Sequence, residues 1–498
     1  MGIVENKNVK GYLLNILRKH WLFFVAFAGM AVYLKLTGSM TSWSGDAGSI
    51  WETIKSFYSG NMVSSYVLYK GFASVFPYAW FYQMSLAFGV GEFVFVKLYH
   101  CLLFAYISTI GFPYLVENLL HIKAKVWRKA VLMLILFWLW KSNHAFDQLM
   151  VDLPSLAYFL LLVNSALKIE KYADERNFTH QIGHYVYTGL LLGLNLCVSG
   201  QYTAAALCII LFILIRTMSR KTLKVRVKRW IALLCLALML GGVFGVTAYN
   251  NYFEDTVTDP LREKGEQIPT GQTWLATGFT RMLGVQRIFS GPLLPDNRGL
   301  SIVQDMYGEK YEEINQLMGD GSMPLTVRQY FSIVTDYPAD FMVRYVNRLF
   351  LAVSPDGGKL SFSHLFVAYT LLFATLLSLK KHCTTLKHFF SLRALIVLSF
   401  VFAIAASIIL NIEMRFVMQL QGLIYGVALL DDTLWDGFDS FGKAVRQCFK
   451  EKSLVILGTN KFPYAFFMYI GFMLLCLAHM ASLYEMIGVN ADVVLFSF

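Results

Sequence analysis

The chain has 498 residues, of which 56% are hydrophobic and 15% are charged, whereas soluble globular proteins average about 45–50% and about 25%. This composition excludes soluble enzymes, disordered proteins, coiled coils and disulfide scaffolds, and it predicts an all-α polytopic membrane protein. The net charge of +11 does not by itself indicate nucleic-acid binding, because Lys and Arg of membrane proteins gather in cytoplasmic loops. We therefore expect no nucleic-acid partner.

The first apolar run extends from about Trp21 to Leu36, after four basic residues. It lacks a convincing small-residue cleavage site, so we expect an uncleaved span with the N-terminus inside. Ten further apolar runs give about eleven predicted spans, with a range of 10 to 13. The further runs are 92–118, 130–146, 153–167, 183–199, 203–216, 230–249, 363–379, 394–410, 416–430 and 463–482.

Aromatic residues crowd the segment 66–90, which also holds Lys70 and Pro77. Reading it as another span would place the basic residues of 119–129 outside, so we predict helices that lie at the outer interface. If successive runs then cross the membrane in alternating directions, six segments of the chain lie inside, and these carry 27 of the 43 Lys and Arg residues. The six segments are 1–20, 119–129, 168–182, 217–229 with Arg216, 380–393 and 431–462.

This orientation divides the chain into three predicted parts. The first, 1–249, is a transmembrane core with outer loops at 38–90 and 143–152. The second, 250–362, is an extracytoplasmic loop domain with ten basic and fourteen acidic residues and no cysteine, so it folds without disulfides. The third, 363–498, holds C-terminal transmembrane helices. The pattern fits a multi-pass protein of the bacterial cytoplasmic (plasma) membrane.

Charged residues collect at the outer ends of the predicted spans, where ionisable groups are functional candidates. Asp46 follows the first span, Asp147 and Asp152 flank the third and fourth, and Glu413 and Arg415 occupy a very short loop between the ninth and tenth. A carboxylate there can accept a hydroxyl proton, and an arginine can hold a phosphate through two parallel hydrogen bonds. Three distant parts of the chain thus face the same side.

Structural interpretations compete with these functional ones. Asp46 can support its own Gly-Asp-Ala-Gly turn or cap a helix that begins near Ser49, and Asp152 can cap the fourth span. Asp147 can be a solvated loop acid, and Glu413 can pair with Arg415.

Two further residues carry the same ambiguity. His144 suits an interfacial histidine better than a metal ligand, although His144 and Asp152 are the weak candidates for a divalent metal site. Lys70 can snorkel to the interface from an apolar helix, or it can hold a phosphate.

The order of these features resembles the GT-C superfamily of integral-membrane glycosyltransferases, in particular its protein-mannosyltransferase-like and aminoarabinose-transferase-like branches. The resemblance rests on the acidic loop around Asp46, the aromatic interfacial segment, the stretch from Gly89 to Leu98, the acidic site near Asp152 and the late Glu413-Met414-Arg415-Phe416 element. It covers the first span to about residue 215 together with that late element.

This resemblance implies an inverting sugar transferase that uses a polyprenyl-phosphate-linked donor and a glycan, lipid or wall-polymer acceptor. Asp46 would be the catalytic base. Substrate-binding roles would fall to Asp152, Asp147, Lys70, Glu413 and Arg415. No cofactor is implied with certainty, and a divalent metal stays open. The sugar, the acceptor and the role of 250–362 are not fixed by the sequence.

Two other functions stay open. A transporter or flippase for a lipid-linked glycan would also have many spans, although it would more often show inverted repeats with broken helices, which are not visible here. A polysaccharide polymerase or ligase would depend on arginines of the large outer loop, such as Arg281, Arg287 or Arg298, and not on Asp46.

Overall fold

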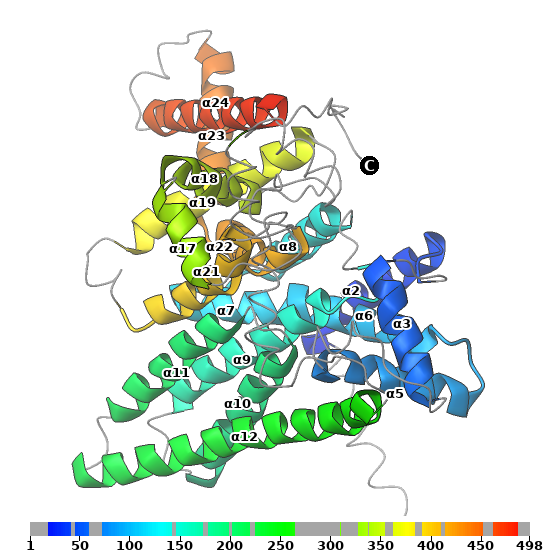
Figure 1. The fold of residues 1–498 in the computed structure, drawn as a ribbon. Coiled ribbons are helices and arrows are strands. Elements are labelled where there is room, and N and C mark those ends of the chain that lie inside the picture. The colour runs from blue at the N-terminus through cyan, green and yellow to red at the C-terminus, as the bar shows by residue number, and fades with distance from the viewer. Residues whose placement is uncertain are drawn as a thin grey trace, which may run out of the picture.

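The described part of the chain is helical throughout (Figure 1). This computed structural model describes residues 18–40, 45–58, 72–141, 146–172, 178–198, 202–219, 225–263, 309, 327–336, 338–353, 362–383, 391–409, 414–451 and 462–486. No strand occurs among them. The helices that coincide with the apolar runs are α2 (Trp21–Leu36), α6 and α7 (Val94–Tyr106 and Phe112–Leu120), α8 (Val126–Trp140), α9 (Asp152–Tyr172), α10 (Phe178–Val198), α11 (Thr203–Met218), α12 (Val225–Glu263), α19 (Phe362–His382), α21 (Ala394–Ile409), α22 (Met418–Leu430) and α24 (Phe462–Met486).

Each of the eleven predicted runs therefore contains a helix. Three continuous helical stretches are long and apolar enough to cross a membrane, namely Val94–Leu120, Asp152–Glu170 and Phe362–His382. Seven shorter apolar helices of 10–17 residues lie at Trp21–Leu36, Ile182–Val198, Thr203–Met218, Leu233–Tyr249, Ala394–Ala405, Met418–Leu430 and Phe466–Ala481. Length and composition thus support a membrane protein.

A π-helical turn, η1 (Ile107–Gly111), interrupts the second predicted span between α6 and α7. Pro113 lies two residues after its end, and a proline cannot donate the backbone hydrogen bond of a regular helix. A wider turn just before the proline accommodates this loss. The side chain of Asn164 on α9 donates to the carbonyl of Gly111 at 3.1 Å, which ties the turn to the fourth predicted span.

The helix α12 is longer than the predicted span 230–249. Its 39 residues correspond to a rise of about 58 Å, nearly twice the hydrocarbon thickness of a bilayer. Trp230 is 69% exposed at one end of the apolar part, and Tyr249 and Tyr252 are 53% and 67% exposed at the other. About 29 Å of helix separates Trp230 from Tyr249, which is the spacing of the two aromatic belts of a membrane span.

Ion pairs join the ends of helices that the sequence places inside. Arg128 contacts Asp432 at 2.5 Å, and Lys129 contacts Glu117 at 2.7 Å. Two further pairs are Arg393–Glu170 at 3.2 Å and His382–Asp431 at 3.0 Å. We call the eight residues of these four pairs the inner belt, after the side of the membrane on which the sequence predicts them. Glu117 lies at the end of the predicted span 92–118, and the other seven residues belong to segments that the sequence predicts inside.

Asp431 is a buried member of this inner belt. Burial alone raises the pKa of its carboxyl, but hydrogen bonds from Thr433 and His382 outweigh burial and hold that pKa well below its ordinary value. A carboxylate of this kind stabilises the fold above about pH 4 and loses that contribution as the pH falls toward its folded pKa. We expect the difference in Tm between wild type and Asp431→Asn to shrink below about pH 4. A pH-independent difference in thermal unfolding scans would contradict this.

Two pairs of glycines, four positions apart in each pair, let helices pack closely, as small residues at this spacing do in membrane helices. The pairs are Gly189 and Gly193 on α10, and Gly422 and Gly426 on α22. On α10, a Cβ at Gly189 would lie 2.2 Å from the carbonyl oxygen of Met239 on α12. On α22, a Cβ at Gly422 would lie 2.1 Å from the ring of Phe112, which is fully buried. Neither position has room for a side chain.

We expect Gly422→Ala to lower the free energy of unfolding by about 1–3 kcal/mol, because the methyl group forces the Phe112 ring out of a packed core. Thermal unfolding in detergent measures this loss. Gly426→Ala, one turn along, is the matched control. Its Cβ would meet Val116 at 3.1 Å, so its effect should be clearly smaller. Equal effects would contradict the close approach at Gly422.

Several helices lie outside the apolar runs. They include α3 (Gly45–Tyr58), α5 (Phe72–Phe88), α17 (Val327–Asp336) and α18 (Pro338–Val353). The helix α5 confirms the helix predicted within 66–90. It contacts α3 through Tyr82 and Trp51, whose rings are 5.3 Å apart. The remaining helix, α23 (Thr433–Glu451), follows the inner belt.

Candidate functional site

Arg415 and Asp152, two residues singled out in the sequence, come together in space. The Nε of Arg415 lies 3.9 Å from Oδ2 of Asp152, although 263 positions separate them in the chain. Their side chains are 16% and 7% exposed. Because both charges are largely withdrawn from water, each acts strongly on the other and on any ligand between the helices.

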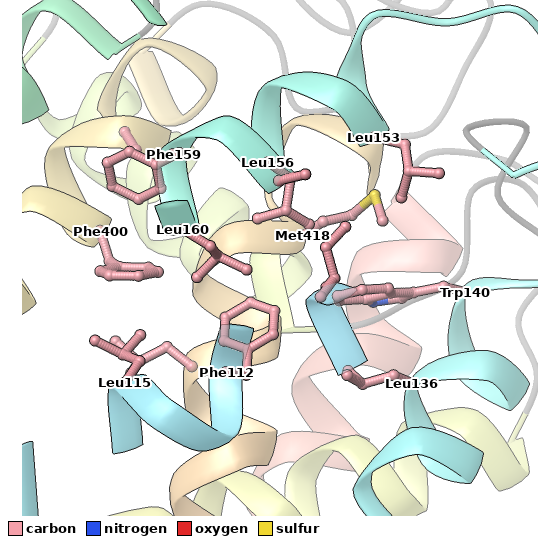
Figure 2. Close-up of a cluster of buried hydrophobic side chains, with 14 of the residues drawn as sticks. Phe112, Leu115, Leu136, Trp140, Leu153, Leu156, Phe159, Leu160, Phe400 and Met418 are labelled. Carbon is pink, nitrogen blue, oxygen red and sulfur yellow. The ribbon is translucent and has the colours of Figure 1, made fainter. Parts of the chain in front are cut away.

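Asp152 is the first residue of α9, and the core fixes its position. Leu153, Leu156 and Phe159 point from α9 into the cluster of buried side chains that includes Phe112 of α7 (Figure 2). This packing holds the start of α9 against α7 and α22. A carboxylate in the first turn of a helix also interacts favourably with the positive end of the helix dipole.

Arg415 lies in a 3₁₀ turn, Met414–Phe416, between α21 and α22. Its Nη1 donates to Sδ of Met150 at 3.1 Å, and its guanidinium carbon lies 5.0 Å from the centre of the Phe416 ring. Met418 of α22 is fully buried next to Trp140 (Figure 2). The guanidinium thus faces the loop before α9, with a thioether and a carboxylate beside it.

A buried pair, Tyr78 of α5 and His100 of α6, holds the loop that leads to Asp152. The Tyr78 hydroxyl donates to the carbonyl of Met150 at 2.8 Å and lies 3.0 Å from Nε2 of His100. His100 Nδ1 lies 3.3 Å from the carbonyl of Phe146. Tyr78 and His100 are both fully buried.

We expect Tyr78→Phe to reduce both stability and activity. The substitution leaves the buried carbonyl of Met150 without its donor, which costs about 1–3 kcal/mol, and it loosens the loop that presents Asp152. Tyr82→Phe on the same helix is the control. A Tyr78→Phe protein with wild-type Tm and wild-type turnover would show that the pair does not hold the loop.

Further polar groups line the same end of the bundle. Gln419 of α22, 1% exposed, donates from Nε2 to the hydroxyl of Tyr202 at 2.6 Å. The hydroxyls of Tyr99 on α6 and Tyr158 on α9 are 2.5 Å apart. Hydroxyl and amide groups of this kind can hydrogen-bond to sugar hydroxyls.

The other predicted site residues differ in how far the structure describes them. Asp46 lies in the first turn of α3, which begins at Gly45 and thus four residues before the helix start expected near Ser49. The side chain of Asp46 is outside the described part, as are Lys70, His144 and Glu413. Asp147 is half-buried, and its charge acts on the hydroxyl of Tyr33 in α2.

The donor set around Asp152 does not suit a divalent metal. The described residues contain no group of three His, Cys, Asp or Glu side chains able to hold one. The neighbour of Asp152 is a guanidinium, whose charge opposes a second cation.

Sequence reasoning missed Tyr78, His100 and Gln419. His100 carried a usable signal, because a histidine inside an apolar run is costly unless it has a partner. Tyr78 was one of many aromatic residues in 66–90, and nothing in the sequence distinguished it.

Comparison with known proteins gives a loose structural likeness. No family model and no curated protein sequence matches the chain. Among solved structures it is similar to the archaeal oligosaccharyltransferase AglB from Archaeoglobus fulgidus in complex with an inhibitory peptide and a dolichol-phosphate, with 13% identity and a TM-score of 0.39. The apo form of the Archaeoglobus fulgidus oligosaccharyltransferase has 14% identity and the same TM-score. Each match covers 96% of this chain and 56% of the other, so the chain spans about half the length of these proteins.

Proposed function

We propose that the protein is a GT-C-type membrane glycosyltransferase that moves a sugar from a polyprenyl-phosphate donor to an acceptor hydroxyl. The observation that carries this proposal is the approach of Arg415 to Asp152 at 3.9 Å at one end of an apolar helix bundle. A cation and a carboxylate at that position supply the two groups that a phosphate-linked sugar requires, a phosphate ligand and a partner for hydroxyls.

Arg415 is the proposed phosphate ligand. Its Nη1 donates to the Met150 thioether, a weak acceptor. A phosphate oxygen in that place forms a stronger, charge-assisted hydrogen bond. The polyprenyl tail then lies against the apolar helices, while Lys70 and Glu413 complete the phosphate end of the site.

Asp46 is the proposed general base. It takes the proton of the acceptor hydroxyl as the hydroxyl oxygen forms a bond to the anomeric carbon. The bond from that carbon to the phosphate oxygen breaks at the same time, and the electron pair leaves with the polyprenyl phosphate. One displacement of this kind inverts the anomeric configuration. Asp152 and Asp147 orient hydroxyls of the sugar or the acceptor.

The proposed reaction takes place on the outer face of a bacterial cytoplasmic membrane. Nucleotide sugars stay in the cytoplasm, so an outward-facing transferase needs a donor that a lipid has carried across. The basic residues of the segments predicted inside support this orientation.

The test is transfer in nanodiscs with a panel of polyprenyl-phosphate sugars and crude envelope glycans as acceptors. We expect release of free polyprenyl phosphate by wild type, with a strong loss in Arg415→Gln. Arg128→Gln, in the inner belt, is the matched control for removing a buried arginine. It tests whether the loss reflects general destabilisation.

No release by folded wild type on any donor would overturn the proposal. Activity that depends on Arg281, Arg287 or Arg298 instead of Arg415 would favour a polymerase or ligase. Movement of the intact donor across the bilayer without release would favour a flippase.

A further inference from the structure

We propose that Arg348 of α18 is a positioning residue that sets the place of Arg415. The inference rests on the proposed function, because it assigns Arg348 a role in binding the donor phosphate through Arg415. It also gives the outer segment 250–362, to which α18 belongs, a direct part in building the site.

The first observation is the contact of Arg348 with the end of α21. Arg348 is 3% exposed, and its Nη1 donates to the carbonyls of Ile408 at 2.9 Å and Ile409 at 2.6 Å. The last carbonyls of a helix have no partner within that helix. A guanidinium satisfies them and also complements the negative end of the helix dipole. Arg348 therefore fixes the point where the chain leaves α21 toward Arg415.

The second observation is that α18 also binds α22, on the other side of Arg415. The Nε2 of Gln421 donates to the carbonyl of Ala352 at 3.1 Å, and the Tyr425 hydroxyl donates to the carbonyl of Val353 at 2.7 Å. Trp140 of α8 donates to Oε1 of Gln421 at 2.9 Å, which holds that amide in place. All three side chains are buried.

The connection that carries Arg415 is thus held at both ends by one helix. Arg348 holds the end of α21 before it, and the carbonyls of Ala352 and Val353 hold the first two turns of α22 after it through Gln421 and Tyr425. Shifting α18 moves both ends together. A guanidinium binds phosphate well only when it is pre-oriented, so losing the Arg348 contact weakens phosphate binding although Arg348 itself does not touch the phosphate.

The experiment measures affinity for polyprenyl phosphate, the product of the proposed reaction, in nanodiscs. We expect Arg415→Gln to weaken binding about tenfold to hundredfold, as the loss of a charged hydrogen bond predicts, and Arg348→Gln to weaken it about tenfold. Arg348→Lys, which keeps a donor and a charge, should recover part of the affinity. Arg328→Gln, at an exposed position on α17, is the matched control and should bind as wild type does.

A double-mutant cycle separates positioning from a general structural role. If Arg348 acts through Arg415, then adding Arg348→Gln to Arg415→Gln causes no further loss of affinity. Independent, additive losses would overturn the inference. Wild-type affinity in Arg415→Gln would overturn the proposed phosphate ligand instead.

A second variant covers the case in which Arg348→Gln fails to fold. Tyr425→Phe removes only the hydroxyl that binds the Val353 carbonyl, and it changes the volume of the core very little. It should weaken binding a few-fold in wild type and not at all in the Arg415→Gln background. Unchanged affinity of Tyr425→Phe in the wild-type background would count against the two-sided hold by α18.

Discussion

Asp46→Asn is expected to lower turnover by about 10²–10⁴-fold, the usual contribution of a general base. An amide of the same shape cannot take the proton of the acceptor hydroxyl, so the bond to the anomeric carbon forms far more slowly. Asp46 lies in the first turn of α3. Release of polyprenyl phosphate in nanodiscs gives the rate.

Folding and donor binding separate a lost base from a damaged site. We expect Asp46→Asn to unfold at the wild-type Tm and to bind polyprenyl phosphate with wild-type affinity. Glu52→Gln on the same helix is the matched control, because Glu52 is 71% exposed and pairs only one turn away with Lys55. Full turnover by Asp46→Asn would remove Asp46 as the base and make Asp152 the next residue to test.

Helix positions were predictable from the sequence because each apolar run is a local signal. Trp21–Leu36 is a helix at the predicted bounds, since an uninterrupted apolar stretch satisfies its own backbone only as a helix in lipid. Helix ends outside the apolar region were less predictable. The helix α12 continues to Glu263 through polar residues whose helical state depends on neighbours, whereas the predicted span ended with the apolar run at residue 249.

The meeting of Asp152 and Arg415 was predictable only as a shared side of the membrane. The distribution of Lys and Arg predicts that both residues lie outside. This prediction depends on the whole chain, because the side of one loop determines the side of the next. The partner of Arg415 was not predictable. Glu413, two positions away, is the nearest acid in sequence, and no local signal indicates the approach of Arg415 to Asp152 across the bundle.

The residues that support the site were hidden for the same reason. Arg348 lies in the segment 250–362, predicted to be outside, with nine other basic residues, and only the packing of α18 against α21 and α22 distinguishes it. Its partners are backbone carbonyls, which every residue possesses. A contact from a side chain to a distant backbone group leaves no pattern in a single sequence.

Asp152→Asn is expected to change mainly kcat, whereas Arg415→Gln is expected to change mainly the donor KM. Asp152→Asn removes a negative charge beside the proposed phosphate site and so lowers repulsion of the donor, which leaves the donor KM unchanged or reduced. It also removes an acceptor for substrate hydroxyls, so kcat falls by about tenfold to hundredfold. Arg415→Gln removes phosphate binding and raises the donor KM by about tenfold to hundredfold.

Steady-state kinetics with one active donor distinguishes these two effects. Because the two side chains lie 3.9 Å apart, a purely structural ion pair would make both variants equally unstable and would change kcat and KM alike. Asp147→Asn controls for removing a nearby carboxylate from the same loop and should have the smaller effect on kcat. A raised donor KM in Asp152→Asn would mean that Asp152 positions Arg415 and does not bind the substrate. In that case Asp147, Gln419 and the Tyr99–Tyr158 pair would be the groups that orient the sugar hydroxyls, because their hydrogen-bonding atoms lie at the same end of the bundle.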